Sequence, residues 1–153
     1  MAPDTKAAPD AEVMAFVVAV DDNEIIAAMH AKAKNPSPAV MEYARMLHVD
    51  HGKKLDATLK LGMQLGMAPA DTMEVDALRQ KGAGGLADIL PLEGAAFDKA
   101  FIDMMVTGHT EALALYDGKL MTMATNDALK AHLATARGHV AHHLEATKAL
   151  QAR

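Results

Sequence analysis

Cysteine and tryptophan are both absent from this sequence of 153 residues, and aromatic residues make up only 3% of it. The lack of cysteine excludes disulfides, thiolate metal sites and cysteine nucleophiles, so any chemistry has to use histidine, carboxylates or methionine. The scarcity of aromatic residues, beside abundant Ala, Leu and Met, is typical of packed helices rather than of strands. We therefore expect an all-α protein.

Charge and hydropathy narrow the class of protein further. The formal net charge is −5, and Lys and Arg are scattered along the chain rather than clustered, which argues against nucleic acid as a main partner. No apolar run approaches the roughly 20 residues needed to cross a bilayer, so we predict no membrane span. A Gly-rich phosphate loop and a Gly-x-Ser-x-Gly motif are also absent. Whether the chain forms an oligomer stays open.

The first ten residues differ in composition from the rest of the chain. Residues 1–10 are rich in Ala, Pro and Asp, and we expect them to form a flexible leader such as follows a cleaved signal peptide, with Met1 as an added start. Residues 11–153 are long enough and apolar enough for one domain with its own core. A periplasmic location is a hypothesis that the absence of cysteine permits.

Apolar residues recur at alternating steps of three and four in four stretches, which predicts four long helices. These helices are expected at Glu12–Lys34, from Pro38 to about Leu65, at about Ala95–Met123 and at Asn126–Ala152. Between the second and the third lies a link of about thirty residues with one short predicted helix, Asp71–Lys81, followed by three glycines. So long a link favours a bundle with a crossover over a simple up-and-down bundle.

Each predicted long helix places one metal-capable side chain on its apolar seam, namely Glu24, His51, His109 and His143. With a rise of roughly 1.5 Å per residue, all four come near mid-height of a crossover bundle about 40 Å long. An unpaired buried polar group costs about 1–3 kcal/mol, so each of them needs a hydrogen bond, a charge or a metal. One carboxylate and three imidazoles suit one transition-metal ion, with zinc favoured and iron and copper as alternatives.

Further residues are candidates for supporting the site or for adding a ligand to it: His48, Asp50, Asp98, Met105 and His139. The two histidines lie one turn from His51 and His143, where they could orient a ligand imidazole. Twelve methionines also keep a Met/His copper site open. Methionine nevertheless fills irregular cores well where aromatic residues are scarce.

Other functions remain open at this point. Three of eight histidines on the seams is no excess over chance, so a metal-free structural bundle, with the histidines bonded to Glu24 and backbone carbonyls, explains the pattern too. A metal-dependent oxidase or peroxide-handling enzyme would need an open coordination position. A di-iron oxidase is disfavoured, because that class uses about four carboxylates. A binding role is the preferred interpretation.

Short motifs that follow one another along the chain also carry a family resemblance. They are Phe16-Val17 with Glu24, Met46–His51, Phe97-Asp98 with Phe101 and His109, and His143-Leu144. Together they resemble a bacterial family of exported ferritin-like proteins, domain of unknown function 4142. The resemblance implies a ferritin-like four-helix bundle with the long crossover, and a periplasmic or envelope location, and it leaves the function open.

Two details qualify the resemblance. The family often carries Leu-Pro before the last histidine, whereas this chain has Arg137-Gly138, so the start of that turn is expected to differ. The segment Phe101–Met105 also looks like a related group of Met- and His-rich exported proteins, some of which bind copper.

Overall fold

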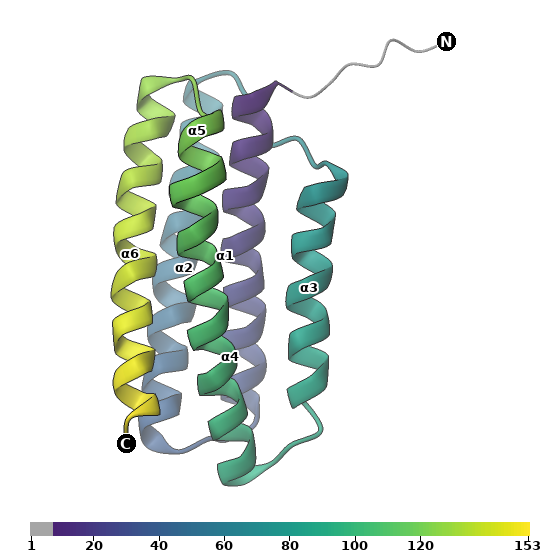
Figure 1. The fold of residues 1–153 in the computed structure, drawn as a ribbon, viewed down its shortest axis with the longest axis vertical. Helices are drawn as coiled ribbons and strands as arrows, with labels where there is room; N and C mark the ends of the chain where they lie inside the picture. The colour runs from purple at the N-terminus through teal and green to yellow at the C-terminus, as the bar shows by residue number, and fades with distance from the viewer. Residues whose placement is uncertain (1–7) are drawn as a thin grey trace.

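A computed structural model describes residues 8–153, and this part of the chain is helical except for short connections (Figure 1). No strand occurs in it, which confirms the all-α prediction. The elements in chain order are α1 (Pro9–Ala33), α2 (Pro38–Gln64), α3 (Met73–Ile89), α4 (Gly94–Leu115), the π-helical turn η1 (Tyr116–Leu120), α5 (Met121–Met123) and α6 (Asp127–Gln151).

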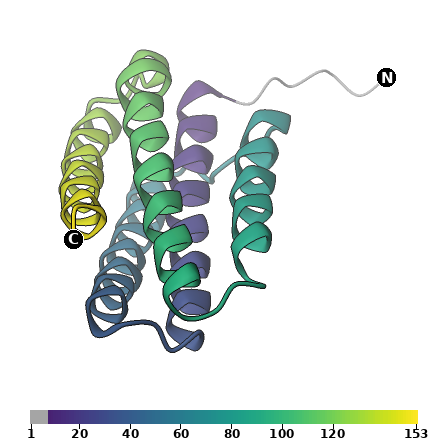
Figure 2. The same ribbon diagram turned by 60° about the horizontal axis from the view of Figure 1, so that its bottom comes forward.

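The four longest helices, α1, α2, α4 and α6, lie side by side, and α3 lies outside them against α1 (Figures 1 and 2). The most extensive packing joins α1 to α2 and α4 to α6. Helices α2 and α4 point in the same direction, because α3 runs back along the molecule between them (Figure 1). No helix in residues 8–153 combines the length and the apolar character needed to cross a membrane.

The apolar core consists of two clusters, one toward each end of the long helices. The first cluster contains Val13–Val20 of α1 together with residues of α4, η1 and the first half of α6. The second contains Ala27–Ala31, residues of α2 up to Leu47 and the first half of α4. On α1 and α4 the predicted seam residue lies between the buried parts of the two clusters, and on α2 and α6 it lies between a buried part and a partly buried residue packed against the other cluster, Leu61 and Ala146 respectively. The apolar packing therefore holds a polar layer at mid-height.

Helix ends follow the sequence closely. Asn126 is the N-cap of α6, and its side-chain oxygen accepts hydrogen bonds from the backbone N–H groups of Ala128 and Leu129. Most of the expected leader, residues 1–7, lies outside the described residues, but α1 already begins at Pro9. Asp10 is buried and accepts hydrogen bonds from Thr125 and Asn126, so it ties the start of α1 to the start of α6.

Helix α3 is longer than the sequence predicts. The expected segment ended at Lys81, whereas the helix continues through three glycines to Ile89. A Cβ at Gly82 would lie 2.5 Å from Asn23 Nδ2 of α1, so this glycine allows the two helices to approach closely. Each glycine costs a helix about 1 kcal/mol relative to alanine. Packing on α1, which is not visible in local sequence, therefore stabilises the second half of α3.

The third predicted long helix is not uniform either. It is α-helical to Leu115, turns π-helical over Tyr116–Leu120 and ends with one further turn at Met123. The periodicity of the sequence gave no sign of this change. Tyr116 is fully buried at the start of the π-helical turn, and its hydroxyl has no hydrogen-bond partner within the described chain.

Candidate metal centre

Three histidines from three helices meet at mid-height. His51 of α2, His109 of α4 and His143 of α6 are each at most 1% exposed, and one ligand-capable nitrogen of each lies within 4.8 Å of the other two. The ring centroids are 4.9 Å apart for His51 and His143, 5.7 Å for His109 and His143, and 6.1 Å for His51 and His109. The structure thus brings the three seam histidines together.

Helical periodicity explains why the three side chains point inward. One turn before each histidine, the same helix carries a buried apolar residue, and these residues are Leu47, Met105 and Val140. Residues three or four apart lie on the same face of a helix, so packing of the apolar residue turns the histidine toward the core as well.

Each imidazole uses one ring nitrogen in a hydrogen bond with an oxygen. His51 Nδ1 lies 2.8 Å from Asp21 Oδ1, and His143 Nε2 lies 3.0 Å from Asp50 Oδ2. His109 Nδ1 donates to the backbone carbonyl of Met105 at 2.8 Å. A carbonyl or carboxylate oxygen accepts a hydrogen bond, so the proton is on the bonded ring nitrogen, and each bond fixes both the ring orientation and the tautomer. The lone pair is left on the opposite nitrogen.

Those opposite nitrogens are unpaired. His51 Nε2, His109 Nε2 and His143 Nδ1 are buried and have no hydrogen-bond partner among residues 8–153. Native proteins pair nearly all of their buried polar atoms, and each unpaired one costs about 1–3 kcal/mol. Three unpaired ring nitrogens in one cluster could be satisfied together by a ligand that accepts all three lone pairs, as a metal ion does.

Glu24 reaches the same cluster from α1. Its Oε2 lies 3.9 Å from His109 Nε2 and also lacks a hydrogen-bond partner in the described chain. The side chain of Glu24 is 10% exposed. Its second oxygen faces Gly108 of α4, where an added Cβ would lie 3.8 Å from Oε1. One oxygen of this carboxylate thus faces the histidines and the other faces Gly108.

Burial keeps two of the imidazoles in their neutral form. It lowers the pKa of His143 to about 4, although the hydrogen bond from the ring to Asp50 opposes the shift. Burial also lowers the pKa of His51 to about 2, with the charge of Glu24 opposing it. Neutral imidazole is the form that ligates metals. These two rings are therefore ready to bind at neutral pH without releasing a proton.

Two buried charged residues behind His51 were missed by sequence reasoning. Asp21 is fully buried and Lys54 is 5% exposed, and Lys54 Nζ lies 3.5 Å from Asp21 Oδ1. Burial raises the pKa of Asp21 to about 6, against the effect of Lys54. It lowers the pKa of Lys54, against the effect of Asp21. A signal did exist, because Asp21 precedes Glu24 by three positions and Lys54 follows His51 by three.

The supporting residues predicted on α2 and α6 have different surroundings. Asp50 is hydrogen-bonded to His143. His48 instead contacts the Lys32 ammonium through Nδ1. His139 is exposed and lines a small surface pocket beside Asp50. The structure therefore shows neither His48 nor His139 among the clustered histidines.

The two supporting candidates on α4, Asp98 and Met105, also have different surroundings. Asp98 accepts a hydrogen bond from the Ser37 backbone N–H at the start of α2, at 3.0 Å. It thus lies at the end of the bundle, about three turns from His109. Met105 contributes its carbonyl to His109, as described above, while its side chain helps to line a groove.

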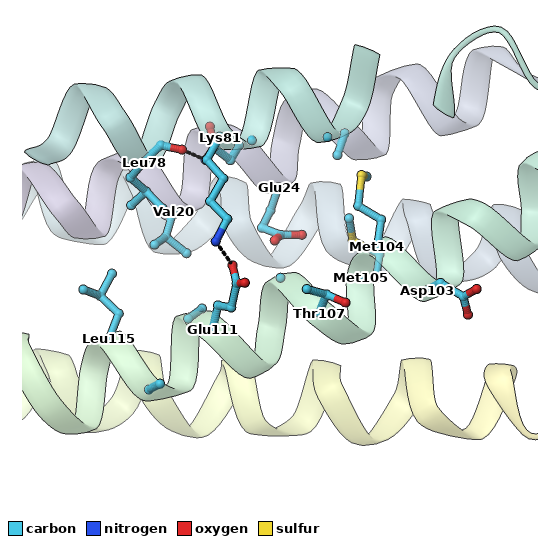
Figure 3. A pocket seen from close by; sticks show the side chains of 17 residues that line it. Val20, Glu24, Leu78, Lys81, Asp103, Met104, Met105, Thr107, Glu111 and Leu115 are labelled. Carbon is cyan, nitrogen blue, oxygen red and sulfur yellow. Dashed lines mark hydrogen bonds and ion pairs between the residues drawn. The ribbon is translucent and has the colours of Figure 1, made fainter. Parts of the chain in front are cut away.

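This groove, of about 830 Å³, lies between α1, α3 and α4 (Figure 3). Its lining is mostly apolar, and Glu24 points into it from α1 (Figure 3). Lys81 of α3 and Glu111 of α4 form an ion pair of 2.7 Å across it. A second, smaller pocket of about 240 Å³ lies on the other side of the centre and is lined by residues of α2 and α6. The groove is the larger of these two openings, and Glu24 connects it to the histidines.

Comparison with known proteins identifies the family to which this chain belongs. No curated protein and no solved structure matched the chain. A family model described as a domain of unknown function, DUF4142, matches residues 1–150, nearly the whole sequence. The match confirms the family resemblance seen in the sequence motifs, and it assigns no function to the histidine cluster. The chain belongs to the DUF4142 family.

Proposed function

We propose that the protein binds one transition-metal ion at mid-height of its long helices, through His51, His109, His143 and Glu24. One observation carries the proposal. In each ring the second nitrogen is buried and makes no hydrogen bond within residues 8–153, and Glu24 Oε2, 3.9 Å from that nitrogen of His109, makes none either. A metal ion would satisfy all four atoms, whereas the three ring nitrogens, which carry lone pairs and no proton, cannot hydrogen-bond to one another.

The donor set indicates which metals fit. Three imidazole nitrogens and one carboxylate oxygen suit the tetrahedral coordination of zinc, and the same donors accept iron or copper. The hydrogen bonds from the rings to Asp21, Asp50 and the Met105 carbonyl resemble the outer contacts that orient metal-bound histidines. Four protein ligands complete a tetrahedral shell, so the proposed role is metal binding rather than catalysis, which needs an open position.

Architecture and location form a second part of the proposal. We infer a ferritin-like bundle, supported by the parallel course of α2 and α4 and by the return of the chain through α3 (Figure 1). We also propose that the protein works in the periplasm, which a chain without cysteine permits. An experimental structure tests the first statement. Fractionation of cells that express the full-length gene product tests the second.

Elemental analysis tests the metal proposal directly. The protein would be purified without a His tag and analysed by inductively coupled plasma mass spectrometry, before and after incubation with zinc, iron and copper. We expect close to one metal ion per chain, and loss of this ion in His143→Ala. The matched control is His142→Ala, because His142 is the adjacent residue but is exposed. It should keep the metal.

Thermal unfolding gives an independent check. A ligand that binds only the folded state raises the melting temperature, so a chelator should lower the melting temperature of the wild type and not that of His143→Ala. A wild type that carries no metal after all three incubations, with a melting curve unchanged by chelator, would overturn the proposal. The metal-free structural bundle would then be the better description.

A further inference from the structure

We infer that the groove between α1, α3 and α4 is the route by which the metal ion enters the centre, with the Glu24 carboxylate transferring the ion from the groove to the histidines. This inference rests on the proposed function and adds a direction of entry to it. It follows from the position of Glu24, from the blocked approaches to the three rings and from the charges along the two openings.

Glu24 is the one proposed ligand that lines the groove. Its Oε1 faces Gly108 on the groove side and its Oε2 lies 3.9 Å from His109 Nε2 on the histidine side. A cation bound first at Oε1 needs only a shift to the other oxygen of the same carboxylate to reach the imidazoles. The side chain is nine-tenths buried, and its Oε2 has no hydrogen bond to break among the residues that the structure describes, so it is free to make this shift.

Gly108 keeps the passage open. It lies in the middle of α4, where glycine is unfavourable relative to alanine. Within residues 8–153, and apart from its chain neighbours and the backbone of its own helix, the one atom within 4 Å of an added Cβ is Glu24 Oε1. Helix packing therefore does not require a glycine at this position, in contrast to Gly82, where a Cβ would collide with Asn23. The missing side chain leaves Glu24 accessible from the groove.

The other approaches to the rings are occupied. Asp21 and Lys54 lie behind His51, the Met105 carbonyl is bonded to His109, and Asp50 is bonded to His143. These contacts all engage the nitrogen that points away from the cluster. An ion arriving along them would have to break a hydrogen bond that orients its own ligand.

The two openings differ in charge. The groove is lined by Glu24, Asp103 and Glu111 against one ammonium, Lys81, although Asp103 is also paired with Lys99 outside the lining. The smaller pocket is lined by Lys53 and Lys54 against one carboxylate, Asp50, and Lys54 is also paired with buried Asp21. A negative groove attracts cations and speeds their association, whereas the smaller pocket has no excess of negative charge to attract them.

The test measures the rate of Co²⁺ uptake by metal-free protein, followed by stopped-flow absorbance, and the amount of Co²⁺ bound at equilibrium. Gly108→Leu places a side chain over Glu24 Oε1 and should slow uptake at least tenfold, with one ion still bound at equilibrium. Thr135→Leu fills the smaller pocket at an exposed position and serves as the matched control. It should take up Co²⁺ at the wild-type rate.

Charge variants give a second measurement, which is informative even if the fold does not tolerate the Gly108→Leu substitution. Lys81→Gln should speed uptake severalfold, Glu111→Gln should slow it severalfold, and both effects should shrink at high salt. Wild-type rates in Gly108→Leu and in both charge variants, or slow uptake in Thr135→Leu, would overturn the inferred route. Failure of the proposed function would look different, because the wild type itself would then bind no Co²⁺ at equilibrium.

Discussion

The two sides of the histidine cluster are built in opposite ways. On the side of His51, the closed side, Asp21 and Lys54 are buried and form an ion pair, and Asp21 is hydrogen-bonded to the ring. On the side of Glu24, the open side, the carboxylate borders the groove beneath α3, and its Oε2 has no hydrogen-bond partner within residues 8–153. This difference suggests that the two sides have different roles. The closed side stabilises the fold and orients the imidazoles, while the metal ion of the proposed function enters and leaves on the open side.

The largest expected effect comes from Asp21→Ala on the closed side. The substitution leaves Lys54 as a buried charge without its partner and His51 without its acceptor. Breaking a buried ion pair in this way costs about 3–5 kcal/mol, and urea denaturation of the metal-free protein would measure the loss. Asp22→Ala is the matched control. Asp22 is the next residue, but it is about one third exposed and paired with Arg79 on the surface, so its removal should cost less than about 1 kcal/mol.

A double variant sharpens this prediction. Replacing the whole buried pair with apolar residues is often neutral, so Asp21→Ala with Lys54→Met should recover most of the stability lost in Asp21→Ala. No recovery would mean that the hydrogen bond to His51, rather than the charge of Lys54, causes the loss.

Acid should weaken the metal-free protein next most strongly. The folded pKa values of His51 and His143 lie below the ordinary value near 6.5, so below about pH 6.5 the unfolded chain takes up two protons on these residues that the folded chain does not, and burial shifts the pKa of His132 in the same direction. Asp21, with a folded pKa of about 6, holds one extra proton in the folded state between about pH 6 and 4. The unfolded chain thus binds two extra protons on His51 and His143, and the folded chain binds one on Asp21. The net difference is one proton on the unfolded chain, so the free energy of unfolding falls as the pH decreases.

The corresponding slope is about 1.4 kcal/mol per pH unit between pH 6 and 4. Urea denaturation at several pH values in the presence of chelator would measure it. The variant His142→Ala should give the same slope, since His142 is exposed. Stability that stays level or rises as the pH falls from 6 to 4 would contradict the burial of neutral imidazoles.

Glu24→Gln on the open side should separate binding from folding. The amide has the same shape but lacks the charge, so metal affinity should fall by at least about 10–100-fold, the loss seen even when residues that merely orient ligands are changed. Stability of the metal-free protein should not decrease, because Glu24 has no hydrogen bond to lose. Calorimetric titration with zinc and urea denaturation with chelator would measure the two quantities.

Glu111→Gln is the matched control, because Glu111 lines the same groove but is exposed and paired with Lys81. Its equilibrium affinity for zinc should stay close to that of the wild type. If Glu24→Gln instead lowered the free energy of unfolding of the metal-free protein by several kcal/mol, Glu24 would stabilise the fold as Asp21 and Lys54 do. The contrast between the open and the closed side would then be wrong.

The sequence predicted a polar layer at mid-height of the helices, but not the difference between its closed and its open side. Heptad spacing places His51, His109 and His143 on buried seams, because residues that repeat at 3.5 positions keep to one face of a helix. Asp21 and Lys54 were missed, because an acid or a lysine beside a seam is usually exposed and its burial depends on the helix opposite. Asp98 lies on the same face but near the helix end, where it meets the backbone of Ser37.

The helices show the same limit. The ends of α2 and α6 followed from proline and N-cap residues, which act locally. The glycine-containing half of α3 and the π-helical turn at Tyr116 did not, because both depend on contacts with helices distant in sequence. The groove between α1, α3 and α4 is lined in part by Gly82 and Gly85 of that unpredicted half and depends on the packing of α3 against α1, so the open side could not be read from the sequence.

The smallest predicted effect concerns the attachment of α3. Only Val75, Leu86 and Ile89 of this helix are buried, and the Arg79 guanidinium joins it to α1 through Asp22 at 2.8 Å. Arg79→Gln should therefore lower the free energy of unfolding by less than about 1 kcal/mol.

Amide hydrogen exchange should reveal a clearer effect of this substitution than the free energy of unfolding does, because it measures the local opening of one helix separately from complete unfolding. We expect Arg79→Gln to exchange faster in α3 alone, while Lys60→Gln, which removes an exposed pair within α2, leaves α3 unchanged. Equal acceleration in all helices would mean that α3 opens only together with the rest of the core. In that case the groove would be as rigid as the closed side, and movement of α3 could not help ions to pass through it.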